Sequence, residues 1–352
     1  MRRLDLRWAL AIVLTLPFEA RAWDRGRVTT FAVLPSGSSG PEGLEVGADG
    51  RVYVTTFGFT SKGASAEPGQ LFVFDARGGL ERQVSVAGSS PHLLGLRFHP
   101  VTGALLVIDF GAGKVLQVNP RTGASRPFLT LPPALPHAGA GSGLNDITFD
   151  HDGSVYVSDS FQGVVWKTGP AGGVAKPWVD DPLLRTTGVP PFGANGLRFN
   201  KHETILFVAN TGDDRIIQVP VESGGVAGMP TVFTNSINGA DGLLVDADDN
   251  LWVAANQSDE IVVVDPSGRA IAKLGDFDGV SVRGSPTHLL FPASLRFSGN
   301  DLLVTNLALN TNLFGFLTVD TAWSAQVSRY TVSRIRARIP SLAGAAGDED
   351  GD

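Results

Sequence analysis

Ala-Asn-Gly-Leu-Arg-Phe at 194–199 is one copy of a six-residue phrase that recurs along the chain about every fifty residues. The other copies are Pro-Glu-Gly-Leu-Glu-Val at 41–46, Leu-Leu-Gly-Leu-Arg-Phe at 93–98, Leu-Asn-Asp-Ile-Thr-Phe at 144–149, Ala-Asp-Gly-Leu-Leu-Val at 240–245 and Pro-Ala-Ser-Leu-Arg-Phe at 292–297. A repeat of this period is typical of an array or a propeller, whose units bury their apolar faces against one another.

Each phrase begins a unit of about four short strands. Turn residues such as Ala48-Asp49-Gly50 follow it and suit a hairpin. Second strands are then expected at 51–56, 104–109, 154–159, 204–210, 250–255 and 301–306. Third and fourth strands follow in most units, and no segment reads as a long helix. Four strands over about fifty residues predict a propeller blade.

The last unit decides how the ring closes. It has its first two strands and a third at 326–335, but no fourth, whereas 28–34 is a strand without a unit of its own. Pairing the two would hide two open sheet edges. We therefore predict an all-β fold, a six-bladed β-propeller closed by an N-terminal strand; seven blades is the alternative.

The first residues resemble a secretory signal peptide. Arg2, Arg3 and Arg7 precede a mostly apolar run at 8–18 and the small-residue site Ala20-Arg21-Ala22. We expect residues 1–22 to be removed, with an uncleaved anchor as the alternative, residues 23–343 to form the propeller and 344–352 to be a disordered acidic tail. The protein is then expected to be secreted or periplasmic. Because the chain has no cysteine, its fold must be stable there without disulfides.

Charge and hydropathy limit the classes of partner that we expect for this protein. The formal net charge of −7 and the lack of a basic stripe speak against nucleic acid. No segment after the first is apolar enough to span a bilayer. A small-molecule substrate is expected, and the oligomeric state is not indicated.

The second position of the phrase varies in a way that the fold alone does not require. It reads Glu42, Leu94, Asn145, Asn195, Asp241 and Ala293 around the six units. Because the first strand of each blade lines the central channel, the four oxygen-bearing side chains should converge near the axis. The alternative is ordinary turn chemistry before a strand, but four such residues in register would be costly in a dry channel.

Two carboxylates and two amide oxygens form a hard ligand set. Glu42, Asn145, Asn195 and Asp241 would suit Ca²⁺ first and Mg²⁺ or Mn²⁺ next, with Zn²⁺ left open. No cysteine is present and no histidine falls in this register, which disfavours a tetrahedral zinc site.

These stretches carry a family resemblance. The phrases at 41–44, 144–150, 194–199 and 240–246, together with the blade spacing, resemble the senescence-marker-protein/gluconolactonase family of calcium-type six-bladed propellers, which is related to paraoxonases and diisopropyl fluorophosphatase. The metal-ligand pattern of that family, Glu-Asn-Asn-Asp, falls on the same four residues. The resemblance implies hydrolysis of lactones or phosphoesters.

Two positions depart from that pattern. Gly143 stands where the gluconolactonase branch has a sugar-binding Arg, and Leu94 stands where paraoxonase-like enzymes have a His. His92 lies two residues earlier and could face the same way, given the period of a strand. Asp241 is our first candidate to activate water or attack directly, and His92 is the second.

Long connections between the strands are rich in apolar residues. They contain Phe57, Phe59, Leu183, Leu184, Phe192, Phe277, Leu289, Leu290, Leu313 and Phe314. An apolar rim predicts a hydrophobic lactone or ester as substrate, although packing on the blade tops would explain the same residues. Two other functions stay open: a non-catalytic propeller that binds a ligand or partner, and a metal-independent strictosidine-synthase-like enzyme.

Overall fold

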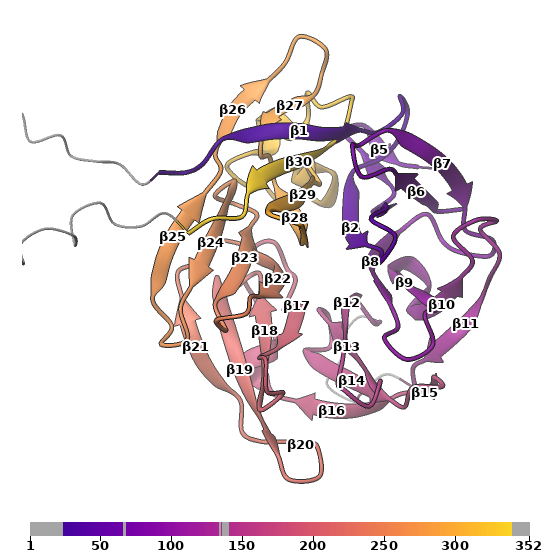
Figure 1. Cartoon of the computed structure of the whole chain (residues 1–352), viewed down its shortest axis with the longest axis vertical. Coiled ribbons are helices and arrows are strands. Elements are labelled where there is room, and N and C mark those ends of the chain that lie inside the picture. Colours follow the sequence, from indigo (N-terminus) through magenta and orange to yellow (C-terminus); the bar gives the residue numbers. More distant parts are fainter. Residues whose placement is uncertain (1–23, 66–67, 134, 136–140, 340–352) are drawn as a thin grey trace, which may run out of the picture.

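Six β-sheets surround a central axis in the computed structural model of the protein, which describes residues 24–65, 68–133, 135 and 141–339 (Figure 1). Blade 1 contains β2 (Pro41–Val46), β3 (Val52–Thr56), β6 (Gln70–Phe74) and β7 (Leu80–Ser85). Blade 2 contains β8 (Leu93–Phe98), β9 (Leu105–Asp109), β10 (Lys114–Val118) and β11 (Ser125–Thr130), and β15 (Gly173–Val174) pairs in parallel with β11. Blade 3 contains β12 (Leu144–Phe149), β13 (Val155–Asp159), β14 (Val164–Thr168) and β16 (Lys176–Asp180).

The second half of the chain repeats this order. Blade 4 contains β17 (Ala194–Phe199), β18 (Ile205–Asn210), β19 (Arg215–Glu222) and β21 (Thr231–Asn235), with β20 (Val226–Ala227) paired to the end of β19. Blade 5 contains β22 (Ala240–Val245), β23 (Leu251–Ala255), β24 (Glu260–Val264) and β25 (Ala270–Leu274). Blade 6 contains β28 (Pro292–Ser298), β29 (Asp301–Asn306), β30 (Thr331–Arg336) and β1 (Val28–Val33).

The ring closes through its two ends. β1 pairs antiparallel with β30, with Val28 opposite Ile335 and Val33 opposite Thr331, so that the N-terminal strand becomes the outer strand of the last blade. This confirms six blades closed by an N-terminal strand. The third strand of blade 6 begins at Thr331, later than expected, because the short helix α1 (Thr321–Ser324) and turns occupy the preceding residues.

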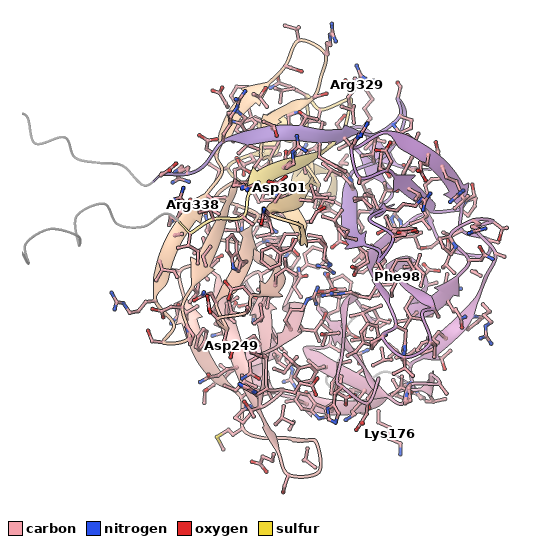
Figure 2. All side chains as sticks on the ribbon, in the orientation of Figure 1. Phe98, Lys176, Asp249, Asp301, Arg329 and Arg338 are labelled. Carbon is pink, nitrogen blue, oxygen red and sulfur yellow. The ribbon has the colours of Figure 1, made fainter. Side chains whose placement is uncertain are left out.

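The first strands of neighbouring blades touch one another around the axis, from β2 through β8, β12, β17 and β22 to β28 and back. The hydrophobic core lies mainly between blades. One cluster joins blades 1 and 2 around Tyr53 and Leu96, and another joins blades 3 and 4 around Tyr156 and Leu197. Charged side chains such as Lys176 and Arg329 lie at the outer margin (Figure 2). Burial between blades, at about 25 cal/mol per Å² of apolar surface, is therefore the main stabilising term.

The connections carry the remaining elements. They are the hairpins β4–β5 (Phe59–Thr60 and Gly63–Ala64) and β26–β27 (Phe277–Val280 and Pro286–His288), α1, and the 3₁₀ turns η1 (Phe110–Ala112), η2 (Pro182–Leu184) and η3 (Thr311–Phe314). Within the described ranges, no helix has the length and hydropathy needed to cross a membrane. The predicted signal peptide (1–22) and the predicted acidic tail (344–352) both lie outside the described residues.

Candidate functional site

A pocket lies at the axis, where the first strands of the blades begin. Its polar lining consists of Glu42, Asn145, Asn195, Thr211, Asp241 and Asn256. Its apolar lining consists of Phe57, Leu94, Pro190, Phe192, Phe291, Leu307 and Leu309. The structure thus brings together the four residues predicted as metal ligands, each at most 5 % exposed. His92 does not line this pocket.

A β-bulge in each first strand directs these side chains toward the channel. In blade 3, Leu144 pairs with Asp159 and Ile147 with Val157, so three steps along β12 match only two along β13. The same irregularity recurs at the matching place in the other five blades. A bulge adds one unpaired residue and re-aims a side chain. The repeated bulge therefore explains why the side chain at the second position of every phrase does not follow the in-and-out alternation of the other side chains of its strand.

Glycine follows the second position in four of the six phrases. At Gly43, Gly95, Gly196 and Gly242, an added Cβ would run into the backbone carbonyl of the corresponding residue in the next blade. These glycines are needed for close approach rather than for an unusual φ, which none of the four has. They keep the polar side chains of neighbouring blades close together around the axis.

Three polar residues at the ends of the second strands hold the pocket side chains. Asn145 Nδ2 donates to Ser160 Oγ at 3.3 Å, and Asn195 Nδ2 donates to Thr211 Oγ1 at 2.9 Å. In blade 5, Asn256 Nδ2 donates to Asp241 Oδ2 at 3.0 Å. Our sequence reasoning missed these partners, although each directly follows a predicted second strand. Aligning the residue after each second strand gives Phe57, Phe110, Ser160, Thr211, Asn256 and Leu307, a second column that is polar only in blades 3, 4 and 5.

Among the residues that the structure describes, neither carboxylate of the pocket forms an ion pair with an Arg, Lys or His side chain. Burial raises the pKa of Glu42 well above its usual range, the charges of Asp241 and Asp146 raise it further, and Arg296 opposes this. Burial also raises the pKa of Asp241 to about 7; the charge of Asp146 adds to this, and hydrogen bonds from Asn256 and Asn195 oppose it. Both carboxylates are thus poorly compensated in the protein alone.

Unpartnered oxygen atoms show that the pocket fits a hard cation. Glu42 Oε2 and Asn256 Oδ1 are buried and accept no hydrogen bond from the described part of the chain. Buried acceptors without donors are costly, and oxygen atoms of this kind are the ligands of Ca²⁺. No group of three His, Cys, Asp or Glu side chains in the described part of the chain could hold a metal. Any cation here would instead combine two carboxylates with amide oxygens.

Comparison with known proteins now gives the family. Residues 89–276, more than half of the chain, match the family described as SMP-30/Gluconolactonase/LRE-like region. The chain belongs to this family. Residues 29–57 also match the N-terminal region of strictosidine synthase-like proteins.

Among curated proteins of similar sequence is lactonase drp35 of Staphylococcus aureus (strain MW2), 31 % identical over 141 residues, which are 37 % of this chain and 41 % of the relative. The chain thus spans less than half the length of this relative. Two solved structures share the fold. A luciferin-regenerating enzyme has a TM-score of 0.63 at 14 % identity and covers 88 % of this chain and 95 % of its own. The calcium-binding protein regucalcin of Agrobacterium tumefaciens has a TM-score of 0.56 at 16 % identity, with 89 % and 95 % covered.

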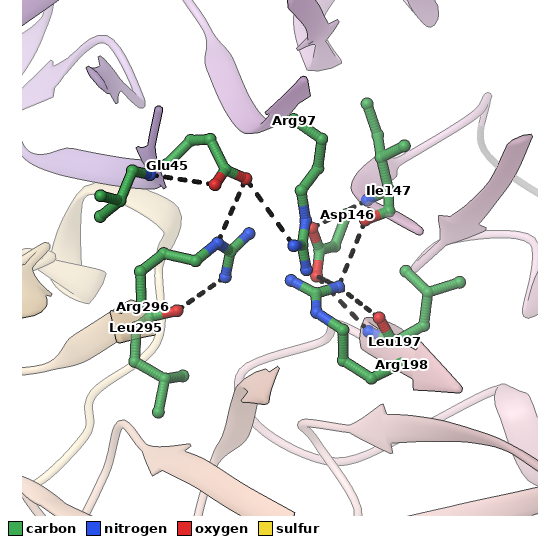
Figure 3. Close-up of polar contacts among 9 residues, drawn as sticks. Glu45, Arg97, Asp146, Ile147, Leu197, Arg198, Leu295 and Arg296 are labelled. Carbon is green, nitrogen blue, oxygen red and sulfur yellow. Dashed lines mark hydrogen bonds and ion pairs between the residues drawn. The ribbon is translucent and has the colours of Figure 1, made fainter. Parts of the chain in front are cut away.

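In this member of the SMP-30/gluconolactonase family, a belt of buried and half-buried charges occupies the channel next to the pocket (Figure 3). Arg198 Nη1 pairs with Asp146 Oδ2 at 2.7 Å, and Glu45 Oε2 lies 3.4 Å from Arg296 Nε and 3.7 Å from Arg97 Nη1. Burial and the charge of Arg296 lower the pKa of Arg97 to about 10. Burial has the larger effect on the pKa of both Glu42 and Asp146 and raises it, whereas the positive charge of Arg296 acts on each carboxyl to lower it.

His92 lies in an aromatic cluster beside the pocket. Its Nδ1 is 2.7 Å from the carbonyl oxygen of Phe57, and its ring stacks on Phe59 with centroids 4.5 Å apart. Phe314 also packs on Phe59, with ring centroids 4.8 Å apart. His92 precedes β8, so the period-two argument from Leu94 does not apply across the bulge between Leu93 and Leu96. Its catalytic role stays a prediction.

The apolar residues of the connections divide between two environments. We define the aromatic rim as Phe57, Phe59, Phe110, Phe161, Phe192 and Phe314, whose rings contact one another in one continuous group beside the pocket. Leu184, Leu289 and Leu290 are instead fully buried in the cores between blades. Packing between the blades therefore explains Leu184, Leu289 and Leu290, whereas a hydrophobic substrate at the aromatic rim stays a prediction.

Three further polar residues at strand ends hold connections rather than the pocket. Asp159 accepts from the backbone nitrogens of Gly143 and Gln162, and Asn210 Nδ2 donates to the carbonyl oxygens of Leu183 and Arg185. Asn306 donates to the carbonyl oxygen of His288 and accepts from the nitrogen of Leu290. Asp159 and Asn210 thereby fix the connections that carry Phe161 and Phe192 of the rim.

Proposed function

We propose that the protein is a hydrolase of lactones or related esters, and that a divalent cation, Ca²⁺ first, takes part in the central pocket. The proposal depends mainly on the buried convergence of Glu42, Asn145, Asn195 and Asp241 in one pocket, in a chain of a family that includes gluconolactonases. The unpartnered oxygens of Glu42 and Asn256 in the same pocket support it. The lactonase name of drp35 and the calcium-binding name of regucalcin support the two parts of the proposal.

The four residues would hold the cation through their oxygen atoms. When bound, such a cation supplies Lewis acidity, which polarises a lactone carbonyl and stabilises negative charge on its oxygen. Two carboxylates balance a divalent charge, and the amide oxygens of Asn145 and Asn195 add neutral ligands. The remaining positions would be filled by water or substrate.

Asp241 is the residue that we propose to activate water or attack the carbonyl. Asn256 Nδ2 donates to Oδ2 of this carboxylate at 3.0 Å and so fixes the orientation of the carboxylate at the wall of the pocket. His92, the second candidate, would need the aromatic rim to open before it could reach a substrate, because it does not line the pocket and stacks on Phe59. We therefore expect His92→Ala to retain more activity than Asp241→Asn.

The apolar half of the pocket indicates the substrate class. The same pocket is lined by Leu94, Phe291, Leu307 and Leu309, together with Phe57 and Phe192 of the rim. The free space between these side chains is only about 30 Å³, so an acyl or alkyl chain could be buried there only after Phe57 and Phe192 of the rim move aside. A sugar would leave its hydroxyl groups without partners against the same apolar side chains. We propose a hydrophobic lactone or ester rather than a free sugar lactone.

The test is metal content after dialysis, followed by hydrolysis of γ-lactones of increasing alkyl length with and without chelator. We expect bound Ca²⁺, activity that chelator removes and Ca²⁺ restores, and preference for longer chains over gluconolactone. A protein that binds no cation and keeps any activity in Asp241→Ala would exclude the proposed site. Activity without metal would favour the strictosidine-synthase-like alternative, and binding without turnover the non-catalytic one.

We also propose that the protein acts outside the cytoplasm, in the periplasm or as a secreted protein, on the basis of residues 1–22. N-terminal sequencing of protein recovered from each cell fraction tests this, and a cytoplasmic protein that still begins at Met1 would contradict it.

A further inference from the structure

Two hydroxyl groups next to the pocket each lie beside a backbone carbonyl oxygen, which fixes the direction of the one hydrogen bond that each can donate. Ser160 Oγ lies 2.7 Å from the carbonyl oxygen of Ala194, and Thr211 Oγ1 lies 2.7 Å from that of Ala240. A carbonyl oxygen only accepts, and a hydroxyl has one proton, so each hydroxyl spends that proton on the carbonyl. Each hydroxyl must therefore act as the acceptor toward its second neighbour.

That second neighbour is the pocket asparagine of the same blade. Ser160 Oγ is 3.3 Å from Asn145 Nδ2, and Thr211 Oγ1 is 2.9 Å from Asn195 Nδ2. Because the hydroxyl can only accept here, the amide must turn its NH₂ group toward it and its oxygen away from it. The assignment of oxygen and nitrogen in both amides thus follows from the hydrogen-bond donors and acceptors around them.

Blades 3, 4 and 5 are linked through these contacts. Ala194 directly precedes Asn195, and Ala240 directly precedes Asp241, so each hydroxyl joins the asparagine of its own blade to the backbone beside the pocket residue of the next blade. Asn256 continues the series by donating to Asp241 Oδ2, and its own Oδ1 is left buried without a partner. All three partner residues are at most 3 % exposed.

We propose that Ser160, Thr211 and Asn256 are positioning residues, which turn the oxygens of Asn145 and Asn195 and the carboxylate of Asp241 toward a hard divalent cation. This inference rests on the proposed function, because it concerns the same pocket. Partners that orient the ligands of a metal typically change its affinity by about 10- to 100-fold when they are removed. The two hydroxyls act through the asparagines and are not themselves in the reaction.

The test compares three threonine variants by calorimetric titration with Ca²⁺ alone. Thr211→Val keeps the shape but loses the acceptor, so we expect Ca²⁺ affinity to fall by about tenfold or more. Thr211→Ser restores the hydroxyl and should bind nearly as wild type. Thr168→Val is the matched control, since Thr168 Oγ1 also donates to a carbonyl, that of Gly172, in an outer turn of blade 3. It should lower stability without changing affinity.

A second measurement keeps the inference separate from the proposed function. In ¹⁵N spectra of the metal-free protein, the side-chain NH₂ of Asn195, assigned with Asn195→Asp, should exchange faster in Thr211→Val than in wild type, although its hydrogen bond to Asp241 remains. Wild-type protein that binds Ca²⁺ while Thr211→Val binds it equally well would overturn the positioning role alone. Wild-type protein without Ca²⁺ binding would overturn the proposed cation, and the exchange of Asn195 would then decide the positioning role.

Discussion

Gly95→Ala is the substitution whose effect the structure defines best. Gly95 follows Leu94 in β8 and is buried against blade 3. An added Cβ would lie 2.7 Å from the carbonyl oxygen of Asn145 and 3.0 Å from both Cα and Oδ1 of Asp146. Cβ atoms in proteins essentially never come closer than 3.0 Å to such atoms, so the backbone of β8 or β12 must move.

The required movement is at least 0.3 Å, the difference between the 2.7 Å contact and the 3.0 Å limit. Overpacking of this kind costs about 1–3 kcal/mol of unfolding free energy, since interiors are close-packed and no flexible side chain can yield. The displaced residue is itself a proposed ligand. Misplacing a functional group by about 1 Å can cost roughly 100-fold, so we expect a severalfold to tenfold loss of Ca²⁺ affinity from the smaller shift.

Urea unfolding and Ca²⁺ titration of the same preparations measure both effects. Gly169→Ala is the control, because an added Cβ there meets nothing within 4 Å and the residue has no left-handed φ. We expect this control to match wild type in both assays. Gly95→Ala that is as stable as Gly169→Ala and binds Ca²⁺ equally well would refute the argument that glycine sets the spacing of the blades around the pocket.

Three other outcomes are expected. Asp259, which accepts from the nitrogen of Phe291 at 2.7 Å, has its pKa raised to about 8 by burial and by the charge of Asp320. The folded protein therefore keeps a proton that the unfolded chain loses near pH 4, so the free energy of unfolding should fall as pH rises from about 4 to 8. This fall should be less steep in Asp320→Asn. Urea unfolding at several pH values measures it, and the same dependence on pH in both proteins would contradict the argument. Leu94→Asn should lower kcat/KM for long-chain γ-lactones by about tenfold and leave kcat/KM for γ-butyrolactone nearly unchanged. The reason is that the substitution removes apolar surface only from the half of the pocket proposed to hold the alkyl chain of the substrate. Adding Ca²⁺ at about 100 times its Kd should stabilise the protein by about 2.7 kcal/mol, seen as a rise in Tm of several degrees that Asp241→Ala abolishes.

The ring of blades could be predicted from the sequence because its signal is repeated. Each phrase is weak alone, but six of them in register fix the blades, and the lone strand at 28–34 fixes the closure. The convergence of Glu42, Asn145, Asn195 and Asp241 followed from the same register, since equivalent positions of a propeller meet at its axis.

The partners of those residues could not be obtained in the same way. Ser160, Thr211 and Asn256 matter through hydrogen bonds whose direction depends on carbonyl groups of the following blade or on a neighbouring carboxylate, which a sequence does not show. The position of His92 was misjudged for a related reason: a strand period of two holds only in unbroken pairing, and the bulge in β8 interrupts it. Bulges leave little trace in a hydrophobic pattern.

The pairing of β1 with β30 also bears on how the molecule folds. Val28 and Ile335 meet only after almost the whole chain has been made, and bringing together segments about 300 residues apart costs about 5 kcal/mol in loop-closure entropy. Until then, blade 6 lacks its outer strand, and both edges of the unfinished ring can pair with another chain. Joining β1 directly after β30 in a circular permutant, with new ends between two other blades, would turn this late contact into a local hairpin and should speed the last step of folding.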